Sequence, residues 1–292
     1  MTTKPSAAPW ADEPFKLIPT PSKTLDINSH SYIYLASEMA YSHNCLLRGL
    51  NSIILQAPHI SPAGSLGYSE QDVRDLLFYV AAWVKTVEHH HHTEETCMFP
   101  EIEAFTGRPG LLDGPKGQHE EFKSGLERLL RYAQETKPEE YRWEEEDGKG
   151  GGMKSIIDAF APSLTRHLYE EIDVFLSLGE FDSDGLRACC DKAEQVAKAT
   201  GNISLLYDVF PCVLGTCDKT YEGGNNFPPL PGVLPYVIKY WFGAYNKGAW
   251  RFNPCDFWGK PVPLHFLPEN NKASQNDDDH CCQVVIHQFG IF

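Results

Sequence analysis

The sequence predicts an all-α protein: an antiparallel four-helix bundle with an additional helix and a loop-rich C-terminal extension packed on it. Three observations support this fold class. Apolar residues recur at helical spacing over four long segments, loops of short or medium length join these segments, and prolines and aromatic residues become frequent from about residue 211. A chain of 292 residues is long enough to bury a substantial core around such a bundle.

The first two bundle helices are separated by a connection that contains prolines. Apolar positions predict the first helix over about 31–56, and Pro58 prevents its continuation. Ser69 is the expected N-cap of the second helix. This second helix continues through a run of four histidines and is expected to end before Gly107 or Pro109.

The third and fourth bundle helices flank an acidic, glycine-rich segment. The third is expected over about 116–134 and the fourth over about 153–178. Pro162 is a position at which the fourth helix can kink. The segment between them, 139–152, holds six acidic residues followed by glycines, which indicates a solvated loop.

The C-terminal third differs in composition from the bundle. A fifth helix is predicted over 183–199, ending near Gly201, and a short helix is expected near residues 235–245. We expect four parts in chain order: a proline-rich N-terminal strap (1–29), the bundle (30–180), a helix with an aromatic, proline-rich extension (181–270) and a polar tail (271–292).

The charge balance disfavours several classes of partner. The chain carries 40 Asp and Glu against 25 Lys and Arg, a net charge of −15, which opposes binding to nucleic acid or to an anionic membrane. It has no stretch long and apolar enough for a membrane span and no apolar core of a secretory signal. We therefore expect an intracellular, cytoplasmic protein whose nine cysteines are reduced thiols.

Histidines supply the strongest functional signal. Each of the four bundle helices carries at least one, on or near its apolar face. Two of them, His90 and His167, are followed by a glutamate four residues later, and such pairs share one helix face. Side chains of this kind on facing helices build metal sites inside bundles. The candidate metal ligands are His43, His90, Glu94, His119, His167 and Glu171.

Each of these positions has an ordinary explanation when taken alone, because a single inward-facing histidine is usually a hydrogen-bonded core residue. Taken together, four buried histidines and two buried glutamates without partners would cost several kcal/mol. A shared metal removes this cost. A mixed set of imidazoles and carboxylates on facing helices suits two non-haem iron ions, and other divalent metals also fit it.

Four motifs in chain order resemble the hemerythrin-like, or HHE cation-binding, family. They are His43, the stretch HHHHTEETCMFPEIE from residue 89 to 103, His119 in GQHEEF and His167 in HLYEEI. The resemblance covers about residues 30–180 and implies a hemerythrin-like bundle that binds iron. The aromatic, proline-rich C-terminal part is similar to the extension of fungal members of the family.

The family pattern can be carried over in two registers on the second helix. Its His-x3-Glu motif, with a proline six residues after the glutamate, matches His90, Glu94 and Pro100. The frame shifted by one, His91 with Glu95, has the same spacing. We prefer the first register and keep the second open.

Two departures from the oxygen-carrying members bear on function. Where these have a second histidine four residues after the third-helix histidine, this chain has Lys123, which would leave a coordination position open or donate to a bound anion. The fourth-helix carboxylate is a glutamate at i+4 instead of an aspartate at i+5. Some family members place an extra ligand directly after the second-helix histidine, which makes His91 a ligand of second rank. The departures argue against simple reversible oxygen carriage.

Three functions remain open. In each, Glu94 and Glu171 would bridge two irons that the histidines cap. The first is a di-iron protein that binds O2, NO or iron itself as a sensor or store, and the second is an O2-dependent oxidoreductase acting on a small organic substrate. The third is an iron-responsive interaction protein. For the second, aromatic residues of the C-terminal segment would roof the substrate pocket, or alternatively form only a packing lid: Phe227, Trp241, Tyr245, Trp250 and Trp258.

Overall fold

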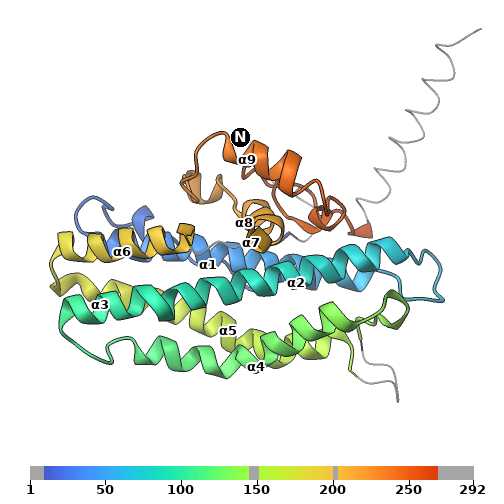
Figure 1. The fold of residues 1–292 in the computed structure, drawn as a ribbon, viewed down its shortest axis with the longest axis horizontal. Helices are drawn as coiled ribbons and strands as arrows, with labels where there is room; N and C mark the ends of the chain where they lie inside the picture. Colours follow the sequence, from blue (N-terminus) through green and yellow to red (C-terminus); the bar gives the residue numbers. More distant parts are fainter. Residues whose placement is uncertain (1–9, 145–150, 200–202, 269–292) are drawn as a thin grey trace, which may run out of the picture.

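The computed structural model describes residues 10–144, 151–199 and 203–268, and within these ranges it contains helices and no β-strand. Four long helices lie side by side and successive ones run in opposite directions (Figure 1). They are α1 (Ser31–Gln56), α2 (Glu70–Thr93), α4 (Asp113–Glu135) and α5 (Met153–Leu176). Helices α1 and α4 each pack against both α2 and α5. The predicted antiparallel four-helix bundle is confirmed.

The second predicted helix is continuous but changes its hydrogen-bonding pattern at the histidine run. A π-helical turn, Glu94–Met98, follows α2 directly, and α3 (Phe99–Thr106) follows the turn. Gly107 ends this helix with a φ of 64°, a left-handed conformation that glycine adopts without a steric penalty. At the other end the Ser69 hydroxyl accepts a hydrogen bond from the backbone N–H of Asp72, as expected of an N-cap.

Glycines allow the bundle helices to approach closely. A Cβ on Gly125 of α4 would lie 2.4 Å from the Cβ of Phe160 on α5. On the opposite side of the bundle, a Cβ on Gly49 of α1 would lie 2.4 Å from Cδ1 of Trp83 on α2. The indole of Trp83 is fully buried and donates its Nε1–H to the carbonyl of Leu46 at 2.9 Å. These contacts fix the spacing between helices that place the histidines.

Two details differ from the predicted boundaries. Helix α4 begins at Asp113, earlier than expected, and α5 ends at Leu176, where a 3-10 turn (Ser177–Glu180) continues the chain. Helix α5 contains Pro162 within a single uninterrupted helical segment. The predicted end of the fifth helix at Gly201 and the polar tail 271–292 lie outside the described residues.

The segment before α1, which contains a 3-10 turn at Pro21–Lys23, packs along that helix. The side chain of Asn44 accepts a hydrogen bond from the backbone N–H of Ile18 at 2.7 Å and donates one to its carbonyl at 2.9 Å. Asn51 does the same with Phe15, at 3.0 and 2.8 Å. Each asparagine therefore satisfies both backbone groups of one residue, in the way that a neighbouring strand would.

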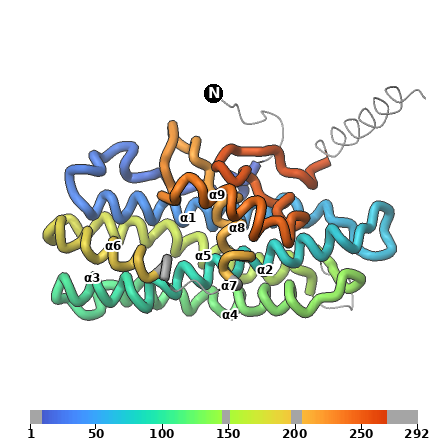
Figure 2. Tube along the Cα trace, turned by 45° about the horizontal axis from the view of Figure 1, so that its top comes forward, coloured from blue at the N-terminus to red at the C-terminus, as the bar shows by residue number. Residues whose placement is uncertain are grey.

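The C-terminal part lies over α1 and α2 (Figure 2). It contains α6 (Ser183–Ala199), α7 (Ile203–Tyr207), α8 (Val209–Thr216) and α9 (Leu234–Val237), which a π-helical turn over 238–242 extends. The short helix predicted near 235–245 is α9 together with this turn.

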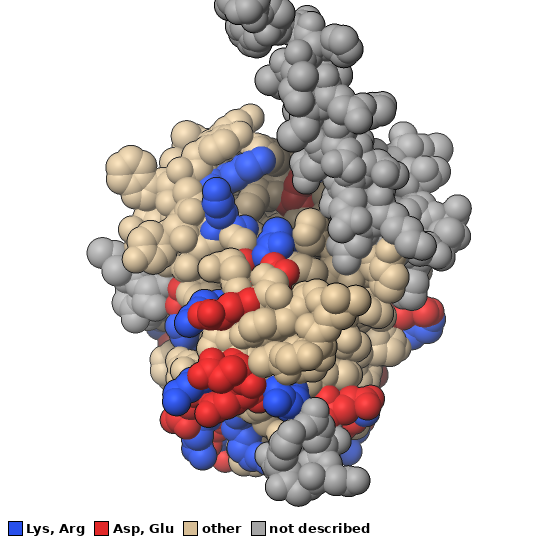
Figure 3. All heavy atoms as spheres, turned by 90° about the vertical axis from the view of Figure 1, so that its right-hand side faces the viewer, with Lys and Arg blue, Asp and Glu red and all other residues tan. Residues whose placement is uncertain are grey.

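A guanidinium fixes the extension to the start of α2. Arg251 donates from Nη2 to Oδ1 of Asp72 at 2.6 Å and to Oδ2 of Asp75 at 2.7 Å. On the end of the bundle shown in Figure 3, acidic and basic side chains lie next to one another instead of forming a surface of one sign. No helix in the described part of the chain is both long and apolar enough to cross a membrane.

Candidate metal centre

Five histidines and two glutamates from all four long helices meet in the interior of the bundle. All seven sequence-predicted residues lie there, and each side chain is buried or nearly so. Helix α1 contributes His43, α2 and the π-helical turn contribute His90, His91 and Glu94, α4 contributes His119, and α5 contributes His167 and Glu171. The side chains form two groups of close potential ligand atoms that have Glu94 in common.

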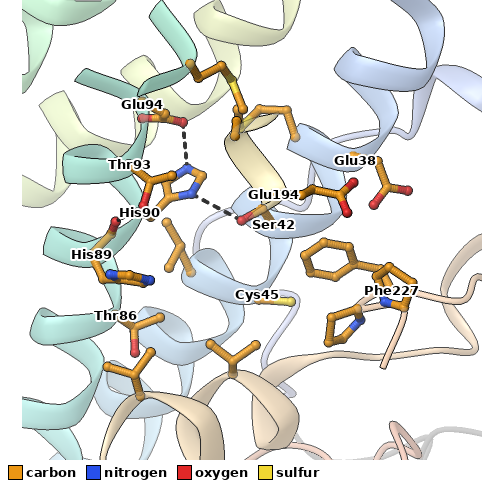
Figure 4. Close-up of a pocket in the computed structure, with 18 of the residues that line it drawn as sticks. Glu38, Ser42, Cys45, Thr86, His89, His90, Thr93, Glu94, Glu194 and Phe227 are labelled. Carbon is orange, nitrogen blue, oxygen red and sulfur yellow. Dashed lines mark hydrogen bonds and ion pairs between the residues drawn. The ribbon is translucent and has the colours of Figure 1, made fainter. Parts of the chain in front are cut away.

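The first group consists of His43, His90 and Glu94. The Nε2 atom of His90 lies 3.0 Å from Oε1 of Glu94, one turn further along the chain (Figure 4). The rings of His43 and His90 meet edge to face with centroids 5.1 Å apart. One ligand atom from each residue lies within 4.8 Å of the others, which is close enough to surround one ion.

The second group consists of His91, Glu94, His119 and His167. The Nε2 atoms of His119 and His167 are 3.1 Å apart, and the ring centroids of His91 and His119 are 4.2 Å apart. Phe122 of α4 packs against all three of these rings and closes this side of the centre.

The two glutamates lie between the groups. Glu94 presents Oε1 to His90 of the first group and Oε2 to His119 of the second, at 3.0 and 3.7 Å. Oε2 of Glu171 is 3.2 Å from Nε2 of His43 and 3.8 Å from Nε2 of His167. Each carboxylate therefore contacts a histidine from both groups, which is the position of a bridging ligand.

Outward hydrogen bonds orient the rings of the first group, and one of them fixes the tautomer of His43. The Nδ1–H of His43 donates to the carbonyl of Leu168 at 2.7 Å, because a carbonyl can only accept. In the neutral ring, Nε2 then carries a lone pair directed at Glu171. Nδ1 of His90 lies 3.3 Å from the hydroxyl of Ser42, which leaves Nε2 to face Glu94.

The second group is oriented in the same way by residues outside it. The Nδ1–H of His119 donates to Oε1 of Glu95 at 2.6 Å, and the Nδ1–H of His167 donates to Oε1 of Gln118 at 3.0 Å. Both Nε2 atoms consequently carry lone pairs that point into the centre. Outer partners of this kind hold the rings of metal-binding histidines in protein metal sites.

The chemistry of these atoms fits a metal. Buried atoms without a hydrogen-bond partner include Nε2 of His43, His90 and His91 and both carboxylate oxygens of Glu94 and Glu171. Buried polar atoms without partners are costly and rare, and every one of these atoms can donate an electron pair. A cation between the groups satisfies all of them. The residues present therefore suit a metal-binding centre of imidazoles and carboxylates.

The protonation equilibria favour the same interpretation. Burial raises the pKa of Glu94 and of Glu171 well above the ordinary range, because it disfavours the charged carboxylate. Burial likewise lowers the pKa of His90 to about 4 and that of His167 to about 2. The imidazoles are therefore neutral, as metal ligands must be, and metal binding would displace protons from the carboxyl groups.

The two sequence registers differ in the position of their glutamates. Both His90 and His91 face the cluster, whereas Glu94 lies inside it and Glu95 lies outside, against the far side of His119. The π-helical turn that begins at Glu94 lets both carboxylates contact His119, an arrangement that frequently marks functional sites.

Lys123 does not reach the centre, so the structure does not support donation from Lys123 to an anion bound there, while the alternative of an open coordination position stays a prediction. The Nζ of Lys123 lies 3.1 Å from Oε1 of Glu120, and more than half of its side chain is exposed. The preceding residue, Phe122, faces inward instead and covers the rings of the second group. Phe122 and Lys123 face different ways because adjacent residues of a helix point about 100° apart.

An apolar cavity of about 300 Å³ adjoins the centre (Figure 4). Its walls come from α1, α2, α6 and α8 and from the segment 227–230, and both His90 and Glu94 line it. Of the five aromatic residues proposed as a roof, Phe227 lines the cavity. Trp241 and Tyr245 are exposed on the surface, Trp250 packs against Phe78 and Tyr79, and Trp258 packs against Tyr236.

The residues that orient the histidines carry no recognisable signal in the sequence. Gln118 directly precedes His119, and Glu95 directly follows Glu94, but neighbours in sequence point in different directions and give no pattern. Ser42 precedes His43 in the same way. Glu38 of α1 and Glu194 of α6 both line the cavity, but they lie far apart in the sequence, so only the folded structure shows that they are neighbours.

Comparisons with known proteins agree with this geometry. Residues 36–178 match the hemerythrin HHE cation-binding domain. The chain is 37% identical over 262 residues to the "Dimeric xanthone biosynthesis cluster protein R11" of Cryptosporiopsis sp. (strain 8999), which covers 89% of this chain and 94% of that protein. No solved structure matches the chain. The resemblance seen in the histidine motifs is confirmed: the chain belongs to the hemerythrin HHE cation-binding domain family.

Proposed function

We propose that this protein is a non-haem di-iron oxidoreductase that uses O2 to oxidise a small, largely apolar organic substrate. The observation that carries the proposal is the cavity, whose wall includes two residues of the metal centre, His90 and Glu94. A protein that only stores iron or senses a diatomic gas has no need of a cavity of about 300 Å³ beside its metal. The relative from Cryptosporiopsis is named for a biosynthesis cluster, which also favours a role in small-molecule chemistry.

The two groups of ligands suggest how two irons would be held. His43 and His90 would bind one ion, and His91, His119 and His167 the other. Glu94 and Glu171 contact histidines of both groups and would bridge the pair. When bound, ferrous iron would supply the electrons that activate O2, a reaction that the protein groups cannot perform themselves, and oxidation of the substrate would return these electrons to the iron.

The remaining groups of the chain would orient the ligands and line the substrate cavity. Ser42, Glu95 and Gln118 hold the imidazoles through their Nδ1 atoms. Apolar side chains such as Met39, Leu46 and Val213 surround the cavity on the substrate side. A substrate in this cavity would lie against the face of the centre formed by His90 and Glu94, among mainly apolar side chains.

The experiment that tests the proposal separates oxidation from storage or sensing. Ferrous protein is mixed with O2 and with a panel of aromatic and aliphatic substrates, and O2 consumption is followed beyond one equivalent per iron pair. An oxidoreductase consumes O2 catalytically with some members of the panel. A store or sensor takes up O2 or NO to a fixed stoichiometry that no added compound changes.

A cavity-filling variant provides the control. Val213→Phe on α8 places a larger side chain in the cavity without altering any candidate ligand. It should abolish substrate-dependent O2 consumption and leave the iron content unchanged. Unchanged consumption in this variant would show that the cavity is not the substrate site, and the sensor or store would then be the better account.

A further inference from the structure

The cavity has polar groups at two separate ends. One end is formed by His90 and Glu94 of the metal centre, and Figure 4 shows Glu38 and Glu194 together on the other side of the drawn pocket. Apolar side chains of α1, α2 and α8 and the segment 227–230 occupy most of the remaining lining. A cavity with apolar walls and few convergent polar groups is the usual form of a small-molecule site.

The residues around Glu38 and Glu194 define what this second end can bind. The hydroxyl of Tyr34 donates to Oε1 of Glu194 at 3.1 Å, so that one carboxylate oxygen already has a donor. Arg187 stacks on the ring of Tyr34 at 3.9 Å, but its Nε donates to Asp191 at 2.9 Å. The carboxyl of Glu38 shares this environment with Glu194, and burial together with that neighbour raises its pKa to about 7.

The opposite end of the cavity is part of the metal centre. Glu94 is 1% exposed, belongs to both groups of potential metal ligands and also lines the cavity. A molecule that fills the cavity therefore lies between a partly buried pair of acceptors and the metal centre. Only a ligand with an apolar body and a hydrogen-bond donor at one end complements both the walls and the acidic end.

We propose that Glu38 and Glu194 are the specificity-determining residues of the cavity and that they accept a hydrogen bond from a hydroxyl group of an aromatic substrate. The hydroxyl group anchors the substrate at the acidic end and directs the rest of the ring system to His90 and Glu94. A hydroxyl donor fits better than an ammonium group, because a cation would have to lose its hydration among apolar walls. What happens to the anchored substrate rests on the proposed oxidoreductase function, whereas the anchoring itself does not.

The test is a binding measurement with three matched probes. Calorimetric titration of the iron-loaded protein without O2, at pH 8 so that Glu38 with its pKa of about 7 is mostly ionised, uses 1-naphthol, its methyl ether 1-methoxynaphthalene, and 1-naphthylmethylamine. The three share a ring system and differ in the donor. We expect 1-naphthol to bind at least about tenfold more tightly than the ether, the effect of one hydrogen bond to a charged acceptor.

Two variants assign this preference to the acidic end. Glu38→Leu should reduce the affinity for 1-naphthol to that for the ether and leave the affinity for the ether unchanged. Glu88→Leu removes a negative charge from α2 outside the cavity lining and should leave all three affinities unchanged. Glu38→Gln keeps an acceptor and should retain part of the preference.

The outcomes distinguish this inference from the proposed function. Equal affinities for 1-naphthol and the ether in the wild-type protein, tightest binding of the amine, or binding of none of the probes would each overturn it. A hydroxyl preference lost in Glu38→Leu, in a protein that never consumes O2 catalytically, would keep the recognition site and remove the oxidoreductase. Catalytic O2 consumption without any hydroxyl preference would support the oxidoreductase and overturn the recognition site.

Discussion

The Nε2 atoms of His119 and His167 face each other across 3.1 Å in the interior of the bundle. Neither ring can supply a proton to this contact in its neutral form, because Nδ1 of His119 donates to Glu95 and Nδ1 of His167 donates to Gln118. Two lone pairs directed at each other are unfavourable unless a cation lies beside them. This single relationship gives the centre its most specific requirement for a metal.

The outer partner of His119 should tune metal affinity. Glu95→Ala removes the acceptor that fixes the ring of His119, and loss of such a partner typically weakens metal binding by about 10–100-fold. Competition with a chelator of known affinity measures the change. Glu120→Ala is the matched control, because Glu120 pairs with Lys123 on the surface. Equal losses in the two variants would mean that the contact with His119 has no special effect.

Ferrous iron should stabilise the fold. The metal binds the folded state, so free iron at about 100 times Kd adds about 2.7 kcal/mol to the free energy of unfolding. For a domain of this size the expected increase in Tm is roughly 5–10 °C. Thermal unfolding without O2, before and after chelation, measures it, and a Tm that does not respond to iron or chelator contradicts the assignment.

The two ligand groups should lose metal separately. His43→Ala removes a ligand of the first group only, and His91→Ala removes one of the second only, so each variant should retain about one iron per chain. Metal analysis after desalting gives these numbers. Lys123→Ala should keep the wild-type iron content, since its Nζ points away from the centre. Loss of iron in that control would contradict the placement of Lys123 outside the centre.

The contact between α1 and α2 should be intolerant of a single added methyl group. Gly49→Ala places a Cβ 2.4 Å from Cδ1 of the buried Trp83, and such overpacking typically lowers the free energy of unfolding by about 1–3 kcal/mol. Gly117→Ala is the control, because a Cβ there meets nothing within 4 Å and alanine favours the helix by up to about 1 kcal/mol. Denaturant unfolding compares them, and similar stabilities would show that the helices separate easily.

The acidic end of the cavity should make stability depend on pH. The pKa of Glu38 is about 7 in the folded protein, raised by burial and Glu194 and lowered by Arg187, against 4.5 for the ordinary side chain. Because the folded state holds this proton more tightly, ionisation of Glu38 destabilises the fold as pH rises from about 4.5 through 7. Glu38→Gln removes this cost, so its Tm should exceed that of the wild type more at pH 8 than at pH 4.5.

The matched control for this pH effect is Glu120→Gln, which changes an exposed glutamate. Its Tm difference from the wild type should not vary with pH over the same range. If Glu38→Gln behaved like this control, Glu38 would titrate as an exposed residue, and the cavity would be open to water at that end.

Much of the fold and of the inner site could be predicted because both depend on helical periodicity. The spacing of four between His90 and Glu94, and between His167 and Glu171, places each pair on one helix face whatever the surroundings. The inward position of His43 follows from the same apolar stripe. Such patterns are local, and the structure brings all of these side chains together.

Features that depend on packing between distant segments could not be predicted. The composition of the extension did not reveal that Phe227 faces the cavity while Trp241 lies on the surface, because this segment has no period that separates its faces. The family pattern left two roles open for Lys123, and only the structure shows that its side chain points away from the centre while Phe122 faces inward. The pairing of Tyr34 with Glu194 joins residues 160 positions apart.

The most direct test of the central claim is the iron content of the ferrous-loaded protein and of Glu94→Ala. Glu94 is the one candidate ligand that belongs to both groups. The account predicts two irons per chain in the wild type and loss of more than one iron in Glu94→Ala, because both positions share this carboxylate. A wild-type protein that holds at most one iron, or a Glu94→Ala variant that still holds two, would contradict a di-iron centre at this site.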